Sequence, residues 1–325
     1  MKAMIHTALG DADVLQLAER PVPAIQAGHL LVKVAATSVN PLDTMLRSAD
    51  TPWSANLPEI LHGDVAGTVV EVGEGVDGFA IGDAVYGCAG GIAGINGALA
   101  EYMLVDADLM AHKPQRLSMA EAAALPLVAI TAWEALHEKL KIGATDRVLI
   151  HGATGGVGHI AVQLAKQAGA TVSATCRPAT LAQATTLGAD HLIDVSQESV
   201  ADYVKRCTDD RGFDAIFDTI AGDNINNSFE AVRLNGAVAT TLPIADPLPI
   251  ALKSLSFHSV LMLLPMIHGQ GRANHGQILR RVAELVDAGK VTPLIDPSRF
   301  SLWQVADAHR HLQSGQAVGK IVLTA

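Results

Sequence analysis

The chain is predicted to be an α/β protein with a β-rich domain and a separate domain built on a parallel sheet. In its first third, short β-branched segments are separated by Gly, Pro and Asp, a pattern typical of a barrel or sandwich. After about residue 125, apolar strands alternate with helices, which indicates a parallel sheet covered on both faces. A chain of 325 residues with 49% hydrophobic residues is long and apolar enough for two such cores.

The last stretch of the chain is too short to be a domain by itself, so we expect it to return and complete the first one. The β-rich domain is then expected at residues 1–124 and 266–325, and the parallel-sheet domain at residues 125–265. Residues 118–121 have the spacing of a capping box, so a helix is expected to begin there. Strands of the β-rich domain are expected at residues 29–39, 67–73, 83–87 and 100–106.

The parallel-sheet domain is predicted as a regular series of strands and helices. An amphipathic helix at residues 278–289 and a strand at residues 319–324 follow this series and end the chain. The strands of the series are expected at residues 147–152, 171–176, 191–195, 213–220, 236–242 and 259–264, with helices at about 156–168 and 181–187.

Residues 150–158 read IHGATGGVG and lie where the first strand of this series passes into its first helix. Here A-x-G-x-x-G stands where G-x-G-x-x-G is usual in dinucleotide-binding turns. Ala153 can serve the tight turn, Gly155 lets the backbone close on a pyrophosphate, and Gly158 lets the helix pack on the strand, while the helix N-terminus offers amides to phosphates. The alternative, that the glycines only permit a tight turn, loses weight because of the surrounding strand–helix–strand pattern.

The chain has no Asp or Glu from His159 through Ala189. An NAD-binding fold has an acid roughly 20 residues past the first glycine, where it accepts the ribose 2′-OH hydrogen bond and repels a 2′-phosphate. Cys176 and Arg177 stand at the end of the second strand instead, with no carboxylate nearby in the sequence. We therefore predict NADP(H), with Arg177 meeting the 2′-phosphate; the alternative is that Arg177 is an ordinary surface cation.

Composition limits the partners. The formal charge of −10 and the pI near 5.7 argue against nucleic acid or an anionic membrane, since both need a basic face. No apolar run reaches the roughly 18 residues of a membrane-spanning helix, and no secretory signal is visible at the start. Cys88, Cys176 and Cys207 lie too far apart for a disulfide framework or a metal knuckle. We expect a protein of the reducing cytoplasm.

Seven segments spread over nearly the whole chain read VAATSVNPLD (34–43), HGDVAGTVVEVGEGV (62–76), GDAVYG (82–87), LPLVAITAWEAL (125–136), VLIHGATGGVGHIAVQLAKQAGATV (148–172), FDTIAG (217–222) and GKIVL (319–323). Together they resemble the medium-chain dehydrogenase/reductase superfamily, and within it the zinc-free quinone oxidoreductase branch related to zeta-crystallin. The resemblance implies a GroES-like β domain formed by both chain ends, a Rossmann domain between them, and an active cleft where the two meet.

The resemblance also bears on zinc. Zinc alcohol dehydrogenases of this superfamily hold the metal with a Cys at the position of Asn40, a His at the position of Gly63, and a further Cys or acid near Pro126. Neither Asn40 nor Gly63 offers a thiolate or an imidazole, and of the four-cysteine structural loop only Cys88 is left. No zinc is therefore expected. His62, one position from the ligand place, is not expected to bind metal.

The expected reaction follows from these features. Without a Lewis acid an alkoxide is not stabilised, whereas hydride donation to an electron-poor acceptor needs orientation and one hydrogen-bond donor for the developing oxyanion. The resemblance thus implies a zinc-independent transfer of a hydride from NADPH to a quinone in the cleft. An alternative is an NADPH-dependent reductase of α,β-unsaturated aldehydes or ketones. A more remote alternative is a non-catalytic NADPH-binding or structural, crystallin-like protein.

The resemblance assigns roles to particular residues. Asn40 is expected to be the polar group nearest the transferred hydride, and the alternative is a capping role beside Pro41. The backbone of Thr154, Gly155, Gly156 and Val157 is expected to hold the pyrophosphate, with Ala153 and Cys176 on the same cofactor surface, Arg177 at the 2′-phosphate, and Thr131, Leu242 and Pro243 on the nicotinamide side.

Other residues are expected to be structural or to act at a distance. Asp43 and Asp64 are expected to support the site, and His309 and His311 are expected at the surface because they lie two apart on a helix. Thr180 and Val195 stand where the branch commonly has a lysine and a tyrosine near the 2′-phosphate, which leaves the selectivity mostly to Arg177. A homodimer is expected through the apolar strand at 259–267; the alternative is that a helix covers that strand.

Overall fold

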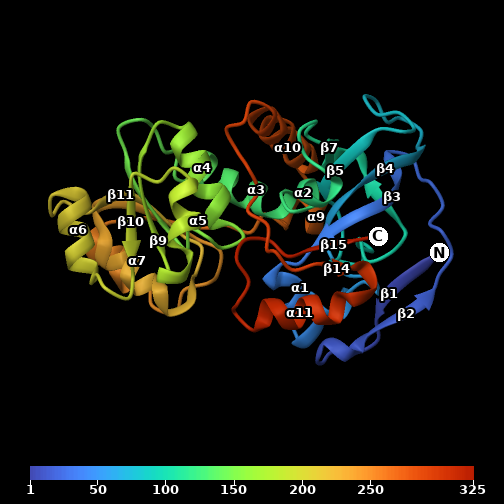
Figure 1. Ribbon diagram of the computed structural model, residues 1–325, viewed down its shortest axis with the longest axis horizontal. Coiled ribbons are helices and arrows are strands. Elements are labelled where there is room, and N and C mark those ends of the chain that lie inside the picture. The colour runs from blue at the N-terminus through green and yellow to red at the C-terminus, as the bar shows by residue number, and fades with distance from the viewer. The chain divides into compact units, whose positions relative to one another are not determined.

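The computed structural model describes residues 1–325. The chain forms two compact units, each described here by itself. The first unit comprises Met1–Leu127, Leu263–Gly289 and Pro293–Ala325, and the second comprises Val128–Met262 and Lys290–Thr292. The first unit therefore contains both ends of the chain, seen as the blue and red ribbons in Figure 1. A β-rich unit and a parallel-sheet unit together confirm the predicted fold class.

The first unit is built on a seven-stranded sheet and a separate two-stranded sheet. The C-terminal strand β15 (Val322–Thr324) pairs antiparallel with β3 (His29–Ser38), so the end of the chain is part of this core. The larger sheet has the order β14-β15-β3-β4-β5-β7, with β6 also on β3, and the smaller is β1-β2. The remaining strands are β1 Lys2–His6, β2 Leu15–Glu19, β4 Asp64–Val72, β5 Ala84–Cys88, β6 Tyr102–Asp106, β7 Met110–His112 and β14 Phe300–Ser301.

Helices of the first unit pack against its larger sheet. The predicted capping box is confirmed: Ser118 Oγ accepts the Glu121 amide at 3.2 Å, and Glu121 Oε2 accepts the Ser118 amide at 2.8 Å. Helix α1 was not predicted from the sequence, although Pro41 at its first position favours a helix start. The helices of this unit are α1 Pro41–Ser48, α2 Met119–Ala123, α9 Leu264–His268, α10 Arg272–Asp287 and α11 Val305–Gln313; α3 Pro126–Trp133 runs across the boundary between the units.

The second unit is a parallel six-stranded sheet with the order β10-β9-β8-β11-β12-β13. The strand order runs outward in both directions from β8 and β11, which makes this a doubly wound sheet. Buried apolar side chains such as Leu149, Ile216 and Phe229 pack on the sheet. The strands are β8 Arg147–His151, β9 Thr171–Cys176, β10 His191–Asp194, β11 Phe213–Asp218, β12 Val232–Thr240 and β13 Ser256–Ser259; the helices are α4 Gly158–Gln167, α5 Leu181–Thr186, α6 Val200–Thr208, α7 Ile225–Ala231 and α8 Leu248–Lys253.

The strand predicted at residues 259–264 is wrong in position. The edge strand β13 ends at Ser259, where the prediction had a strand begin and continue to residue 264. Val260, Met262 and Leu263 are at most 4% exposed, so their apolar character reflects burial and not strand pairing. Pro265 lies in the first turn of α9 and has no amide to continue a ladder. A short apolar run does not by itself distinguish a strand from other buried segments.

Candidate functional site

The carboxyl ends of the parallel strands bring four polar or sulfur-bearing side chains to one edge of the second unit. They are the last residues of β8, β9, β11 and β12, namely His151, Cys176, Asp218 and Thr240. All four are at most 5% exposed. Ligands of open parallel sheets bind at this edge, where the strand order reverses, here between β8 and β11.

The turn between β8 and α4 requires glycine at defined positions. Gly152 has φ +75°, a backbone conformation that side chains disfavour. A Cβ on Gly158 would lie 2.0 Å from the Gly152 carbonyl oxygen, and one on Gly155 would lie 3.3 Å from it. A side chain at Gly158 is therefore sterically excluded, and one at Gly155 would be in tight contact. Gly158 therefore lets α4 begin directly against the end of β8.

Not every amide of this turn is left for a ligand. Ala153 donates its amide to Thr175 O at 2.8 Å, and Gly155 donates to Gly152 O at 3.0 Å. The amides of Thr154, Gly156 and Val157 make no hydrogen bond within the protein. These three lie directly before α4, where backbone amides and the helix dipole favour an anion.

Thr180 links this turn to the segment that carries Arg177. The Thr154 hydroxyl donates to the Thr180 hydroxyl oxygen at 3.0 Å, and Thr180 donates to the carbonyl of Arg177 at 3.1 Å. Thr180 is 2% exposed, whereas Arg177 is exposed. Thr180 therefore fixes the backbone from which Arg177 extends.

A carboxylate that is distant from Cys176 in the sequence lies beside it in the fold. Asp194 ends the adjacent strand β10 and pairs in register with Cys176. Burial, and then the Asp194 charge, raise the pKa of the Cys176 thiol. Asp194 Oδ1 accepts the amide and the hydroxyl of Ser196 at 2.9 and 2.7 Å. Sequence distance concealed this acid, because strand pairing alone brings it to the same edge as Arg177.

His151, at the end of β8, was not predicted as a site residue from the sequence. Its Nδ1 lies 3.3 Å from Thr175 Oγ1, and its Nε2 is buried without a partner. Burial lowers the pKa of His151 to about 4, so the ring is neutral. Thr240 Oγ1 is likewise buried without a partner. A polar residue that ends an apolar strand was the available signal for both.

The nicotinamide-side residues predicted from the sequence lie in this unit too. Thr131 is buried in α3, at 4% exposure. Leu242, 47% exposed, and the exposed Pro243 follow the carboxyl end of β12 and thus belong to the same edge as Thr240. Leu242 and Pro243 are exposed apolar side chains, which suit contact with a flat ring.

In the first unit Asn40 is the centre of a buried polar network. It is the N-cap residue of α1, 1% exposed, and its amide donates to Asp43 Oδ2 at 2.7 Å. Its side-chain nitrogen donates to Asp64 Oδ2 at 2.8 Å, and its side-chain oxygen accepts a hydrogen bond from Lys320. The structure thus places Asn40 at a helix cap, as the alternative interpretation had it, and also ties its amide to two charged groups.

The charges of this network are close together and buried. Asp64 also accepts hydrogen bonds from Ser38 Oγ at 2.6 Å and from the Leu127 amide at 2.8 Å. Burial raises the pKa of Asp43 to about 7, and the nearby Asp64 charge adds to this. Burial lowers the pKa of Lys320 while the two carboxylates oppose that change. Lys320 was missed because it comes from the opposite end of the chain.

The side chains around Asn40 do not fit a zinc ion. A Cβ on Gly63 would lie 2.9 Å from both Cys88 Sγ and Gly90 O, which leaves no room for an imidazole at that position. Burial, then the charges of Asp64 and Asp43, raise the pKa of Cys88 and disfavour the thiolate. The ammonium of Lys320, 3.5 Å from Asp64 Oδ2, would repel a second cation.

The expected surface position of His309 is wrong. His309 is fully buried and its Nε2 lies 2.9 Å from Nε2 of His62, which is also fully buried. His311 faces another way, as its spacing predicts, and its Nε2 lies 3.1 Å from Asp296 Oδ1. His62 has φ +70°, a left-handed backbone conformation for a residue with a side chain. The two imidazoles fill a core position and leave no open ligand site.

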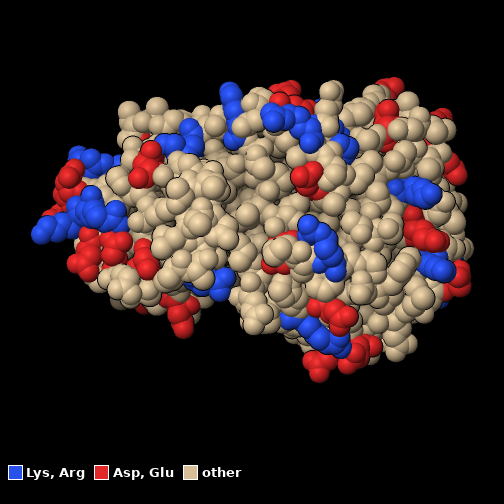
Figure 2. All heavy atoms as spheres, in the orientation of Figure 1, with Lys and Arg blue, Asp and Glu red and all other residues tan.

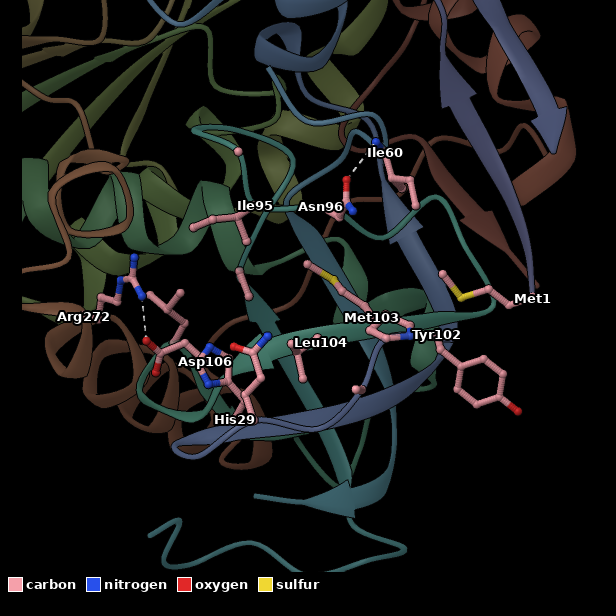
Figure 3. A pocket seen from close by; sticks show the side chains of 17 residues that line it. Met1, His29, Ile60, Ile95, Asn96, Tyr102, Met103, Leu104, Asp106 and Arg272 are labelled. Atoms are coloured by element: carbon pink, nitrogen blue, oxygen red, sulfur yellow. Dashed lines mark hydrogen bonds and ion pairs between the residues drawn. The ribbon is translucent and has the colours of Figure 1, made fainter. Parts of the chain in front are cut away.

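A surface pocket of about 510 Å³ opens elsewhere on the first unit (Figure 3). Arg272 and Asp106 form an ion pair of 2.8 Å at its margin, and Asn96 Oδ1 accepts the amide of Ile60 at 3.2 Å. None of the predicted site residues lines this pocket. Arg272, Asp106 and Asn96 are thus engaged in bonds within the pocket lining, and no predicted catalytic or cofactor residue lies there.

Surface features agree with the composition. On the face that Figure 2 shows, acidic and basic side chains lie mixed in small groups and form no basic tract. None of the helices combines the length and apolar character that crossing a bilayer requires.

Two family models match this chain. The alcohol dehydrogenase GroES-like domain matches residues 26–115, and a model described as zinc-binding dehydrogenase matches residues 187–323.

Named relatives align over almost the whole chain. An Arabidopsis thaliana protein named NADPH-dependent alkenal/one oxidoreductase, chloroplastic, is 33% identical over 99% of this chain and 79% of its own length. The chloroplast envelope quinone oxidoreductase homolog of the same plant is 34% identical over 97% of this chain and 95% of its own length. The crystal structure of an alcohol dehydrogenase superfamily protein from Novosphingobium aromaticivorans superposes with a TM-score of 0.94 at 36% identity, covering 100% of this chain and 99% of that one.

Proposed function

Because this chain belongs to the quinone oxidoreductase branch of the medium-chain dehydrogenase/reductase superfamily, we propose that it is an NADPH-dependent reductase of quinones. The observation that carries the proposal is the turn before α4, which glycine closes and which leaves three amides for a phosphate. The relative named chloroplast envelope quinone oxidoreductase homolog supports a quinone as the acceptor. A second candidate is reduction of α,β-unsaturated aldehydes or ketones, which the name of the alkenal/one oxidoreductase supports.

The residues at the sheet edge fit a dinucleotide. The amides of Thr154, Gly156 and Val157 would hold the pyrophosphate, and Arg177 would meet the 2′-phosphate. Ala153, Gly155 and Cys176 would shape the backbone around them, and Thr131, Leu242 and Pro243 would contact the nicotinamide side. When bound, NADPH supplies the hydride. The buried, unpartnered His151 Nε2 and Thr240 Oγ1 are further polar atoms that a ligand at this edge could satisfy.

The Asn40 side-chain amide would donate a hydrogen bond to the acceptor. A carbonyl that accepts a hydride develops negative charge on its oxygen, and a positioned amide N–H stabilises that charge. Asp64 and Lys320 fix the Asn40 amide, so its donor is oriented before the acceptor binds. We propose that the reaction needs no zinc, which the misfit of the Gly63 and Lys320 positions supports.

Assembly and location belong to the same proposal. We propose a homodimer through the edge of the parallel sheet, where β13 at Ser256–Ser259 is the last strand in place of the strand expected at 259–267. Light scattering after size exclusion at low micromolar concentration tests the dimer, and a monomer mass would reject it. We propose a reducing cytoplasmic compartment, since all three cysteines are free and buried.

The test measures NADPH oxidation by EDTA-treated protein with three acceptors in parallel: 1,4-benzoquinone, 9,10-phenanthrenequinone and a 2-alkenal. A fourth reaction measures reduction of NADP⁺ by an alkyl alcohol. Turnover mainly of the quinones supports the proposal, and turnover mainly of the alkenal supports the second candidate. Alcohol oxidation that requires added zinc would reject the zinc-free mechanism. Bound NADPH with no turnover of any acceptor would support a non-catalytic role.

A further inference from the structure

We infer that Lys320 is a positioning residue whose buried ammonium holds the Asn40 side-chain amide in a single orientation. This inference rests on the proposed reductase function, in which Asn40 serves the acceptor. Lys320 does not itself touch acceptor or cofactor in this scheme; it acts through Asn40.

The backbone places the Lys320 ammonium. Lys320 donates its amide to Leu294 O at 2.9 Å, and its carbonyl accepts the Asp296 amide at 2.9 Å. The preceding Gly319 has φ +74°, and a Cβ there would lie 2.2 Å from Leu294 O. Gly319 and the β-bridge between Lys320 and Ile295 thus fix the backbone at Lys320. The Lys320 side chain points into the core and is 3% exposed.

The partners of the ammonium determine how the Asn40 amide is turned. An ammonium only donates hydrogen bonds. Lys320 Nζ donates to Val39 O at 2.9 Å and to Asn40 Oδ1, so the oxygen end of the amide faces it. The nitrogen end then faces Asp64 Oδ2, to which it donates at 2.8 Å.

The opposite amide orientation is excluded electrostatically. A flipped Asn40 would point its N–H₂ at the Lys320 ammonium and its oxygen at the Asp64 carboxylate. Both contacts would be repulsive, and both would occur among buried groups where charge is poorly screened. Without the ammonium, only Asp64 would oppose the flip, and that carboxylate would lose the ion pair at 3.5 Å.

The test is a comparison of Lys320→Met, which removes the charge and all donors, with Lys320→Arg, which keeps a cation that only donates. We expect Lys320→Met to lower kcat for the accepted quinone or alkenal by about tenfold or more, with the roughly 10²–10³-fold cost of a lost oxyanion donor as the upper limit. The Kd for NADPH should stay the same, because the ammonium serves the acceptor side. Lys320→Arg should retain most of kcat.

A double mutant shows whether Lys320 acts through Asn40. Asn40→Ala should lower kcat, and Lys320→Met should then add little further loss, because the group it positions is gone. The matched control is Lys113→Met, which removes a part-buried lysine that donates to the carbonyls of Pro114 and Leu117. This control should leave kcat near the wild-type value.

Each outcome decides the inference. Folded Lys320→Met with wild-type kcat, or losses that simply add with those of Asn40→Ala, would overturn it. If Lys320→Met does not fold, Lys320→Leu, which also removes the charge and all donors, takes its place with the same expectation. If the wild type turns over no acceptor, the proposed function fails, and the inference is tested separately by side-chain amide NMR of Asn-selectively ¹⁵N-labelled protein. Lys320→Met should then shift or broaden the Asn40 amide pair, and an unchanged pair would reject the inference.

Discussion

His62 and His309 lie with their Nε2 atoms 2.9 Å apart and their ring planes 3° from parallel, although 247 positions separate them in the chain. Thr37 donates its hydroxyl hydrogen to Asp64 O at 2.5 Å, so it accepts from His62 Nδ1, which lies 3.4 Å away. His62 Nε2 is then an acceptor, and His309 Nε2 must be the donor. The pair therefore holds one hydrogen between two neutral rings.

The first prediction is that acid destabilises the first unit through this pair. Burial lowers the pKa of His309 to about 3 and that of His62 well below its usual value. The unfolded chain binds protons at these residues below about pH 6.5 while the folded chain does not, so each site lowers stability by about 1.4 kcal/mol per pH unit as the pH falls. His309→Leu should weaken this dependence.

The measurement is urea unfolding between pH 7.5 and 5.5 by tryptophan fluorescence. Trp133→Phe leaves Trp53 and Trp303, both in the first unit, as reporters. At pH 7.5, His309→Leu should be less stable by about 1–3 kcal/mol, because His62 Nε2 loses its donor. It should then lose less stability on acidification than the parent. Equal slopes in parent and variant would contradict the neutral pair.

The second prediction concerns Asp43, whose contribution to stability changes with pH in the opposite direction to that of the histidines. Burial raises the pKa of Asp43 to about 7, so between about pH 4 and 7 the folded chain binds a proton that the unfolded chain does not. Its contribution to stability is full at low pH and is lost as the pH rises through 7. Asp43→Asn keeps an acceptor for the Asn40 amide but cannot ionise.

The stability of Asp43→Asn relative to the parent should therefore rise by about 1.4 kcal/mol per pH unit from pH 5 to 7. The same urea series measures it. A difference that is constant over this range would show that Asp43 is already ionised in the folded protein.

The fold could be predicted from the sequence because its signals are local. The capping box at Ser118, the glycines after β8 and the apolar strands are each recognisable within a few residues. The edge strand β13 was misplaced because Val260, Met262 and Leu263 are buried outside any strand, and a short apolar run does not distinguish a strand from another buried segment.

The site could be predicted only in part, because much of it is formed by distant residues. Asn40 and Cys176 were identified, but Lys320 beside Asn40 and Asp194 beside Cys176 were not, since chain return and strand pairing bring these pairs together. His309 was predicted at the surface because its spacing from His311 shows only that the two side chains lie on different faces of the helix. The spacing does not show which face is buried.

The third prediction is that zinc is not a component of the enzyme. Elemental analysis of protein expressed with added zinc should find well below one zinc per chain, and EDTA should leave NADPH oxidation unchanged. Gly63 offers no metal-ligating atom, and its surroundings leave no room for a larger side chain. The buried ammonium of Lys320 also lies beside Asp64 and would repel a metal ion. About one zinc per chain, with activity lost on its removal, would reject this prediction.

The fourth prediction tests the phosphate turn. Gly158→Ala should raise the Kd for NADPH at least about tenfold or destabilise the second unit, because its Cβ would overlap the Gly152 carbonyl. Gly155→Ala should have a smaller effect. Gly143→Ala is the control, since the nearest atom to its Cβ lies at 4.0 Å. NADPH fluorescence titration and thermal unfolding measure both effects, and a wild-type result for Gly158→Ala would refute the close approach.

The fifth prediction sets Arg177 against Asp194 in the choice of cofactor. Arg177→Ala should lower the ratio of kcat/KM for NADPH to that for NADH by about 10–100-fold, because hydrogen bonds to a charged phosphate contribute about 1.5–3 kcal/mol. Asp194→Asn should raise the same ratio a few-fold, since it removes a negative charge beside Cys176 that would repel a 2′-phosphate. The two changes thus act in opposite directions on one ratio.

Arg206→Ala is the control for this pair, because Arg206 is a surface arginine of the same unit that pairs with Glu198 at 2.8 Å. It should leave the cofactor ratio unchanged. If Arg177→Ala also leaves the ratio unchanged, Arg177 is an ordinary surface cation and another group selects the cofactor. If Asp194→Asn lowers the ratio instead of raising it, the carboxylate orders the loop after β10 through Ser196 and does not act by its charge.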